Sequence, residues 1–238
     1  SMKMPDLRRA LAQTNLFKSG KKIDILGFDV CLAGMIEVAF EIADYAYVMT
    51  ASQRTAPGDG WPYNTILSAL SANIQTYSTE NLATQIVDKY YAAYTDPSLN
   101  ITQAAYRLNQ IPILKTAIDN FADALCDANI WSNIRDARQS IQDNSEEMDD
   151  GDDIDGGGNT GIDLWAFADL LSSTSSSSVN AAAATLKNAI KNNFIIRFKY
   201  RSDIVSSSTS WNGLAICLPL KSYNSVYNNA IKFGKETK

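Results

Sequence analysis

The segment GFDVCLAG holds an aspartate and a cysteine two residues apart, and these side chains are the ones best suited to chemistry. Asp29 and Cys31 follow the apolar run IDILGF, and an amphipathic stretch begins almost at once. Such a run predicts a buried, central parallel strand, and the next stretch predicts a helix. Unpaired backbone N–H groups where the two meet favour a thiolate, the nucleophilic form of cysteine. The segment therefore predicts a nucleophile at Cys31, with a small buried hydrophobic residue as the alternative.

A nucleophilic thiol needs a base, and the sequence contains no histidine. The base takes the thiol proton and returns it to the leaving group, and imidazole has the best-matched pKa for this task. Either a histidine comes from another polypeptide or Cys31 is inert. In addition, the strands that carry chemistry in open α/β sheets lie inside the sheet, yet here the first recognisable strand carries the thiol. We expect the opening strands of the sheet on a separate polypeptide.

Two carboxylates are expected near the thiol. In an alternating strand Asp29 would share a face with Cys31, where its charge opposes thiolate formation, so a task in binding a substrate cation makes more sense. Capping of the next helix is the alternative. The loop QRTAPGDGWPYN holds Asp59 between glycines and just before Trp61. An acid beside an aromatic ring suits a Lys or Arg side chain, and an ordinary turn with a buried Trp is the alternative.

The rest of the chain predicts an α/β fold in which helices and strands alternate. Helices are expected over 5–15, from residue 35, and over 64–74, 80–94, 109–128 and 179–190. Strands are expected over 23–28, 46–52, 98–108, 193–200 and 212–220. We predict a catalytic core over 1–142, an acidic, Gly- and Ser-rich loop region over 143–178, and a helix-strand extension packed on the core over 179–238.

Composition excludes several partners. The net charge of −5 offers no attraction to nucleic acid or to an anionic membrane, and no apolar run approaches the length of a membrane span. The three cysteines fit no zinc motif, so no metal ligand is predicted. The acidic run MDDGDDIDGGGN invites calcium but fails the EF-hand pattern, because the fifth position is Ile154 or Gly157. We expect Cys126 and Cys217 in the core and Glu37 and Glu41 on a solvated helix face, and we interpret Tyr45, Tyr47, Tyr90 and Tyr91 as packing residues.

These stretches together resemble the clostripain family of cysteine peptidases, relatives of caspases, legumains and gingipains. GFDVCLAGMIEVAFEI is similar to the nucleophile segment of the family and ASQRTAPGDGWPYN to its next loop, while GIDLWAF and NGLAICLPL are weaker matches. The resemblance implies a caspase-like α/β/α sandwich with a mostly parallel central sheet. It also implies that this chain is a heavy chain, whose catalytic His belongs to a light chain cleaved from the same precursor.

The resemblance implies an endopeptidase that cleaves after Lys or Arg through a thioester on Cys31. The backbone N–H of Cys31 would contribute to the oxyanion site, and Asp29, Asp59 and Trp61 would form the pocket for the basic side chain. Self-processing and a secreted or periplasmic location follow from family habit, no cofactor is required for the chemistry, and a calcium requirement stays open. The alternatives are a catalytically silent module that binds basic peptides, and a thiol acyltransferase or amidase.

Overall fold

The centre of the molecule is a four-stranded sheet, seen in a computed structural model that describes residues 4–144, 161–202 and 211–218. Its strands lie in the order β1 (Ile23–Gly27), β2 (Ala46–Ala51), β3 (Thr102–Arg107) and β5 (Ile195–Tyr200). β1 and β2 are parallel, whereas β3 is antiparallel to both of its neighbours. The predicted α/β sheet is confirmed, and three of its strands share one direction. Parallel hydrogen bonding is nevertheless confined to β1 and β2. The sequence could not predict this, because an apolar run indicates that a strand is buried and not in which direction it runs.

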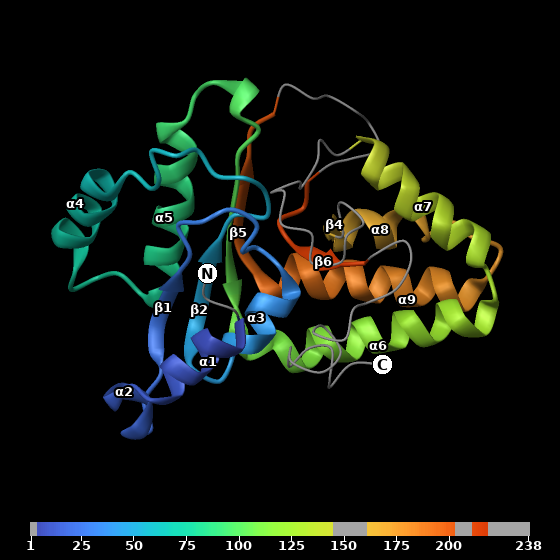
Figure 1. Ribbon diagram of the computed structural model, residues 1–238, viewed down its shortest axis with the longest axis horizontal. Coiled ribbons are helices and arrows are strands. Elements are labelled where there is room, and N and C mark those ends of the chain that lie inside the picture. The colour runs from blue at the N-terminus through green and yellow to red at the C-terminus, as the bar shows by residue number, and fades with distance from the viewer. Residues whose placement is uncertain (1–3, 145–160, 203–210, 219–238) are drawn as a thin grey trace.

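Helices cover both faces of this sheet (Figure 1). On one face α5 (Thr79–Ala93) packs Ala83 and Val87 against Val48 and Ala105, and α4 (Tyr63–Asn73) lies beside it. The larger core lies on the other face and draws on α1 (Met4–Ala12), α3 (Ile36–Ile42), α6 (Ile111–Ala128), α8 (Leu164–Leu170) and α9 (Ser177–Asn188). The arrangement is the predicted α/β/α sandwich. No helix of the described ranges combines the length and hydropathy that a bilayer span needs.

The shorter elements complete the chain. They are α2 (Asn15–Lys18), α7 (Trp131–Asn144), the 3₁₀ turns η1 (Pro97–Leu99) and η2 (Leu108–Gln110), the π-helical turn η3 (Ala189–Phe194), and the antiparallel strands β4 (Gly161–Asp163) and β6 (Ala215–Cys217). The expectation of a loop region over 143–178 is wrong from residue 161, where β4 and α8 begin. Asp163 fixes this start, because its buried carboxylate accepts from the Ala166 N–H and caps α8. The acidic run considered for calcium lies in 145–160, outside the described residues.

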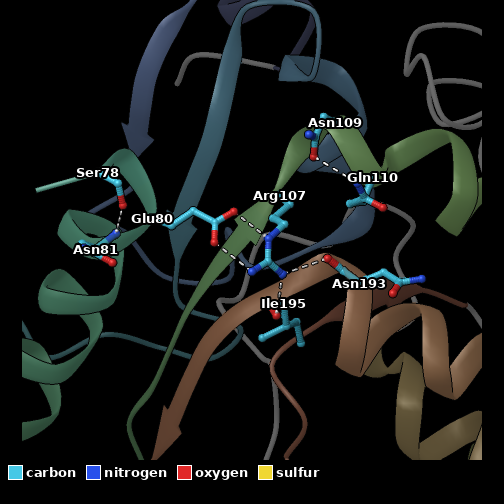
Figure 2. A network of polar contacts seen from close by, with 8 residues as sticks. All are labelled: Ser78, Glu80, Asn81, Arg107, Asn109, Gln110, Asn193 and Ile195. Atoms are coloured by element: carbon cyan, nitrogen blue, oxygen red, sulfur yellow. Dashed lines mark hydrogen bonds and ion pairs between the residues drawn. The ribbon is translucent and has the colours of Figure 1, made fainter.

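A charged network ties α5 to the sheet (Figure 2). Ser78 caps α5 by accepting from the Asn81 N–H at 3.1 Å, and Glu80 in the first turn receives two hydrogen bonds from Arg107 at 2.6 and 2.8 Å. Arg107 ends β3 and also donates to the carbonyl oxygen of Asn193 at 3.1 Å. Because the Arg107 guanidinium joins α5 to β3 and to the turn before β5, it fixes the position of α5 against the strands.

The strand β1 forms one edge of the sheet within the described residues. Ile23, Ile25 and Leu26 are only partly buried, which departs from the predicted central, fully buried strand. An edge strand presents unpaired N–H and C=O groups and is a ready template for another strand. β1 therefore carries more apolar surface than the described part of the chain covers.

Of four side-chain placements predicted from sequence, one is confirmed and three are not. Cys217 is buried in β6 as predicted, but Cys126 on α6 is exposed. Glu37 and Glu41 were expected on a solvated face, and both are buried. The Glu37 carboxylate accepts from the Cys217 N–H at 2.8 Å, and Glu41 pairs with Arg8 at 3.0 Å. All seven residues of α3 are buried because α1 and β6 pack over it, which the sequence of a short helix does not reveal.

Candidate active site

Cys31 lies in a turn at the carboxyl end of β1. The strand ends at Gly27 and α3 begins at Ile36, so the thiol is exposed on an irregular segment between them. This segment is hydrogen-bonded to the loop that follows β2, where Leu32 donates to the carbonyl oxygen of Arg54 at 3.0 Å. Because β1 and β2 are parallel, both loops leave the same end of the sheet (Figure 1). The topology thus brings the two loops singled out in the sequence side by side.

The sulfur atom of Cys31 is contacted by the loop after β2. The Ala56 N–H donates to Sγ at 3.2 Å, and the Ala56 carbonyl oxygen lies 3.9 Å from the same atom. We expected the first turn of the next helix to supply such a donor, and this was wrong. Leu32 adopts φ of 58°, so the chain reverses and reaches Ile36 before the helix begins. The backbone donor at the sulfur therefore comes from the loop after β2 and not from α3.

Asp29 binds the acidic loop and not the following helix. Its Oδ2 accepts from the Trp61 N–H at 3.0 Å and from the Tyr63 hydroxyl at 2.9 Å. Its Oδ1 is buried and has no hydrogen-bond partner within the described residues. The hydrogen bond from the hydroxyl to Asp29 is the main reason that the pKa of Tyr63 is raised. α3 starts without a side-chain cap, so the alternative of a capping role for Asp29 in α3 is not supported.

The loop that carries Asp59 is irregular, as its Pro and Gly content predicts. Gly60 has φ of +70°, and a Cβ there would come within 2.7 Å of Asp29 Oδ2, so only glycine fits. The carbonyl oxygen of Gly60 accepts from the Tyr94 hydroxyl at 2.5 Å. Trp61 lies against Gly27, where an added Cβ would be 2.6 Å from the ring. Asp59 itself is exposed beside these fixed neighbours.

Tyr90 in α5 and Tyr94, which directly follows this helix, lie beneath the loop, and sequence reasoning gave them no role at the site. The Tyr90 and Tyr94 rings are 5.0 Å apart. Burial, and then the charges of Asp59 and Asp29, raise the pKa of Tyr94. Tyr90 was expected to be a packing residue and is fully buried, whereas Tyr47, expected to pack likewise, is half exposed; the pKa of Tyr90 is raised by burial and then by Tyr94, Asp29 and Cys31. Their spacing of four residues on one helix was the available signal, but it is equally typical of ordinary packing.

The arrangement provides an exposed thiol and two carboxylates at one end of the sheet, and no histidine. Within the described residues no acceptor meets the Cys31 N–H. The sequence has no histidine, and Ala56 supplies the hydrogen-bonding groups found at Sγ. In the described ranges no group of three or more acidic, Cys or His side chains is placed to hold a metal. The structure brings Cys31, Asp29, Asp59 and Trp61 to one end of the sheet, as the sequence predicts.

Several solved structures have this fold. The chain superposes on a B. fragilis cysteine protease with a TM-score of 0.64 and 18% identity, covering 98% of this chain and 91% of that one. The chain also superposes on a clostripain from Bacteroides thetaiotaomicron in complex with the peptide inhibitor BTN-VLTK-AOMK. The TM-score is 0.63 and the identity 15%, covering 98% of this chain and 93% of that one. Superposition on a secreted C11 cysteine protease from the same organism gives a TM-score of 0.65 and 17% identity, and this chain covers 62% of that longer protein.

Sequence comparison identifies the family. A search of the curated proteins found no match. The profile of the Clostripain family, by contrast, matches residues 1–233, nearly the whole of the 238-residue chain. The matched range includes the turn with the thiol, the acidic loop and α5. The chain belongs to the clostripain family of cysteine peptidases.

Proposed function

We propose that this chain is the nucleophile-bearing part of an endopeptidase that cleaves peptide bonds after Lys or Arg. The observation that carries the proposal is the exposed Cys31 thiol, which lies at the same sheet end as the buried, unpaired Oδ1 of Asp29. A thiol next to a buried acceptor fits a reaction that holds a cationic side chain while the adjoining carbonyl is attacked.

Cys31 Sγ would attack the carbonyl carbon of the scissile bond. The tetrahedral oxyanion would accept from the Cys31 N–H, and collapse would break the C–N bond to give a thioester and an amine. The proton taken from the thiol goes to the leaving nitrogen, and water then hydrolyses the thioester to a free acid and the thiol. Sulfur and a nitrogen base suffice for these steps, so no cofactor is required.

The base would be a histidine on a light chain of the same precursor. The free edge of β1, with its partly exposed Ile23, Ile25 and Leu26, supports this proposal. A strand added parallel to β1 would end near Cys31, because the carboxyl ends of parallel strands meet at one edge of a sheet. Self-processing by cleavage between the two chains would also fit the specificity proposed here.

The pocket for the basic side chain would use Asp29 and Asp59, with Trp61 as a wall. Two carboxylates in a partly dry site pair with the cation, and removing one costs roughly 2–5 kcal/mol of binding energy. The peptide inhibitor bound to the B. thetaiotaomicron clostripain, VLTK, ends in lysine, which supports a basic residue on the acyl side. Secretion is proposed by analogy with the secreted relative, and a calcium requirement is left to a chelation assay.

The absence of a histidine also favours a second candidate, a silent module that binds basic peptides. A comparison of two cysteine variants in the full precursor separates the candidates. Cys31→Ala should abolish cleavage of Lys and Arg substrates and self-processing, whereas Cys126→Ala, which removes another exposed thiol, should leave both within about two-fold of wild type. Cleavage that persists in the Cys31 variant refutes the peptidase. A wild-type precursor that binds basic peptides without cleaving them supports the module, and transfer to an added amine identifies an acyltransferase.

A further inference from the structure

Two polar atoms near the site are buried without a partner. Tyr90 is fully buried, and its hydroxyl meets no hydrogen-bond partner in the described ranges. Asp29 Oδ1 is likewise buried and unpaired among those residues. Native proteins leave few buried polar groups unsatisfied, because each costs free energy that only a partner recovers. Both atoms belong to side chains connected to the acidic loop, Asp29 directly and Tyr90 through Tyr94, so a donor is expected beside that loop.

The geometry places both atoms in one unit with the acidic loop. The ring of Tyr90 packs on Tyr94, whose hydroxyl holds the carbonyl oxygen of Gly60, next to Asp59. The other oxygen of Asp29 holds the Trp61 N–H in the same loop. Burial raises the pKa of Tyr90, and the charges of Tyr94, Asp29 and Cys31 add to this shift. At neutral pH this hydroxyl stays protonated and neutral.

The end of α5 is fixed from the opposite side. Arg201 follows β5, and its Nε donates to the Tyr94 carbonyl oxygen at 2.8 Å. Its guanidinium also lies over the Tyr91 ring at 4.3 Å. A cation at the carboxyl end of a helix is favourable, so Arg201 holds the turn from which the Tyr94 side chain reaches the loop. The Tyr94 backbone thus accepts a hydrogen bond from Arg201, and its hydroxyl donates one to the acidic loop.

We propose that Tyr94 is a positioning residue for the loop that carries Asp59, and that the Tyr90 hydroxyl binds the cationic end of the substrate side chain beside Asp29 Oδ1. An ammonium or guanidinium group brings several N–H donors, and a phenol oxygen and a carboxylate oxygen accept from it. The proposal rests on the proposed function and adds to it the helix that determines the preference for basic residues.

The test compares three tyrosine-to-phenylalanine variants of α5 in the full precursor. Tyr91→Phe is the matched control, because its ring packs on Arg201 and it takes no part in the pocket. Tyr94→Phe should raise KM for Lys and Arg substrates roughly ten-fold at nearly constant kcat, as expected for a displaced acidic loop. Tyr90→Phe should lower kcat/KM roughly ten-fold, while its Tm stays equal to wild type or rises because a buried unpaired hydroxyl is removed.

Alkylation of Cys31 by iodoacetamide is the accompanying readout, and its rate should be unchanged in all three variants. Wild-type kinetics in Tyr94→Phe or in Tyr90→Phe overturns the proposal for that residue. A parallel loss of alkylation, kcat and Tm also overturns it, because that pattern indicates a structural role alone. If wild type and Tyr91→Phe do not cleave basic substrates at all, the proposed function itself has failed, so the two failures are distinguishable.

Discussion

Replacing Gly60 by alanine perturbs the candidate pocket at a point where the structure leaves no room. Gly60 has φ of +70°, and a Cβ would lie 2.7 Å from Asp29 Oδ2. That oxygen is the acceptor for the Trp61 N–H at 3.0 Å. The added methyl group must therefore distort the left-handed turn, push the Asp29 carboxylate away, or do both. Gly58, two residues earlier in the same loop, has no atom within 4 Å of an added Cβ, and its φ is not positive.

The magnitude follows from two effects. A left-handed conformation costs a residue with a Cβ about 1–2 kcal/mol. A weakened hydrogen bond to a charged carboxylate costs about 1.5–3 kcal/mol if the carboxylate moves. The second effect alone corresponds to a loss of roughly ten- to hundred-fold in kcat/KM for a basic substrate, provided that Asp29 binds the cation. The strain should lower Tm by about 2–4 °C for each kcal/mol in a chain of this size.

The assay measures kcat/KM for matched Lys, Arg and norleucine substrates, with thermal unfolding in parallel. Gly60→Ala should lose most of its preference for Lys over norleucine, whereas Gly58→Ala should keep it within about two-fold, because nothing surrounds the new methyl group. Iodoacetamide should alkylate Cys31 at similar rates in both variants. If the two alanine variants are indistinguishable in specificity, the contact between the Gly60 turn and Asp29 does not shape the pocket.

Two further predictions concern the framework. Arg8→Ala should destabilise the chain by about 3 kcal/mol, because it removes an ion-pair partner of the fully buried Glu41. Arg9→Ala on the same helix breaks an exposed pair with Asp6 and should change the denaturant midpoint little, so equal effects would contradict the buried-charge argument. The pKa of Glu80 is lowered by its hydrogen bonds from Arg107, so this group adds stability above the unfolded-state value of about 4.3 and loses it as pH falls below that value. Glu80→Gln should therefore reduce stability at pH 7 by about 1 kcal/mol or less and leave stability at pH 3 unchanged; a difference that persists at pH 3 would count against this sign.

Hydrophobic periodicity predicted most of the long helices and strands well, because it indicates which side chains are buried. The expected strands over 46–52 and 193–200 and the helices over 80–94 and 109–128 appear within one or two residues of their predicted limits. Strand direction was not predictable from the same signal, since β3 is as buried as β2 and yet runs antiparallel to β2 and β5. Short segments with tertiary support were missed as well. β4 and α8 follow a glycine-rich run, and their start depends on the Asp163 cap, which a composition-based argument does not weigh.

The components of the candidate site were predictable from sequence, and their contacts were not. Asp29 and Cys31 were expected on one face of an alternating strand, but the strand ends at Gly27 and each residue instead contacts the loop after β2. Tyr94 contacts the site through a hydrogen bond to Gly60, 34 positions earlier, and no local sequence pattern indicates a contact at that separation. The parallel pairing of β1 and β2 makes the site compact, because it places two loops that are about 25 residues apart in the sequence at one end of the sheet.

The proposed light chain would account for two features of this chain together. Its composition lacks the histidine that a peptidase thiol would use, and among the described residues β1 lies at the edge of the sheet with apolar side chains partly exposed. A single strand added parallel to β1 would cover those side chains and end beside Cys31, where an imidazole at its carboxyl end could take the thiol proton. A base recruited from elsewhere in this chain would leave the edge unexplained, and a purely structural partner would leave the thiol without a base. On this proposal, one added strand would both supply the histidine and complete the sheet.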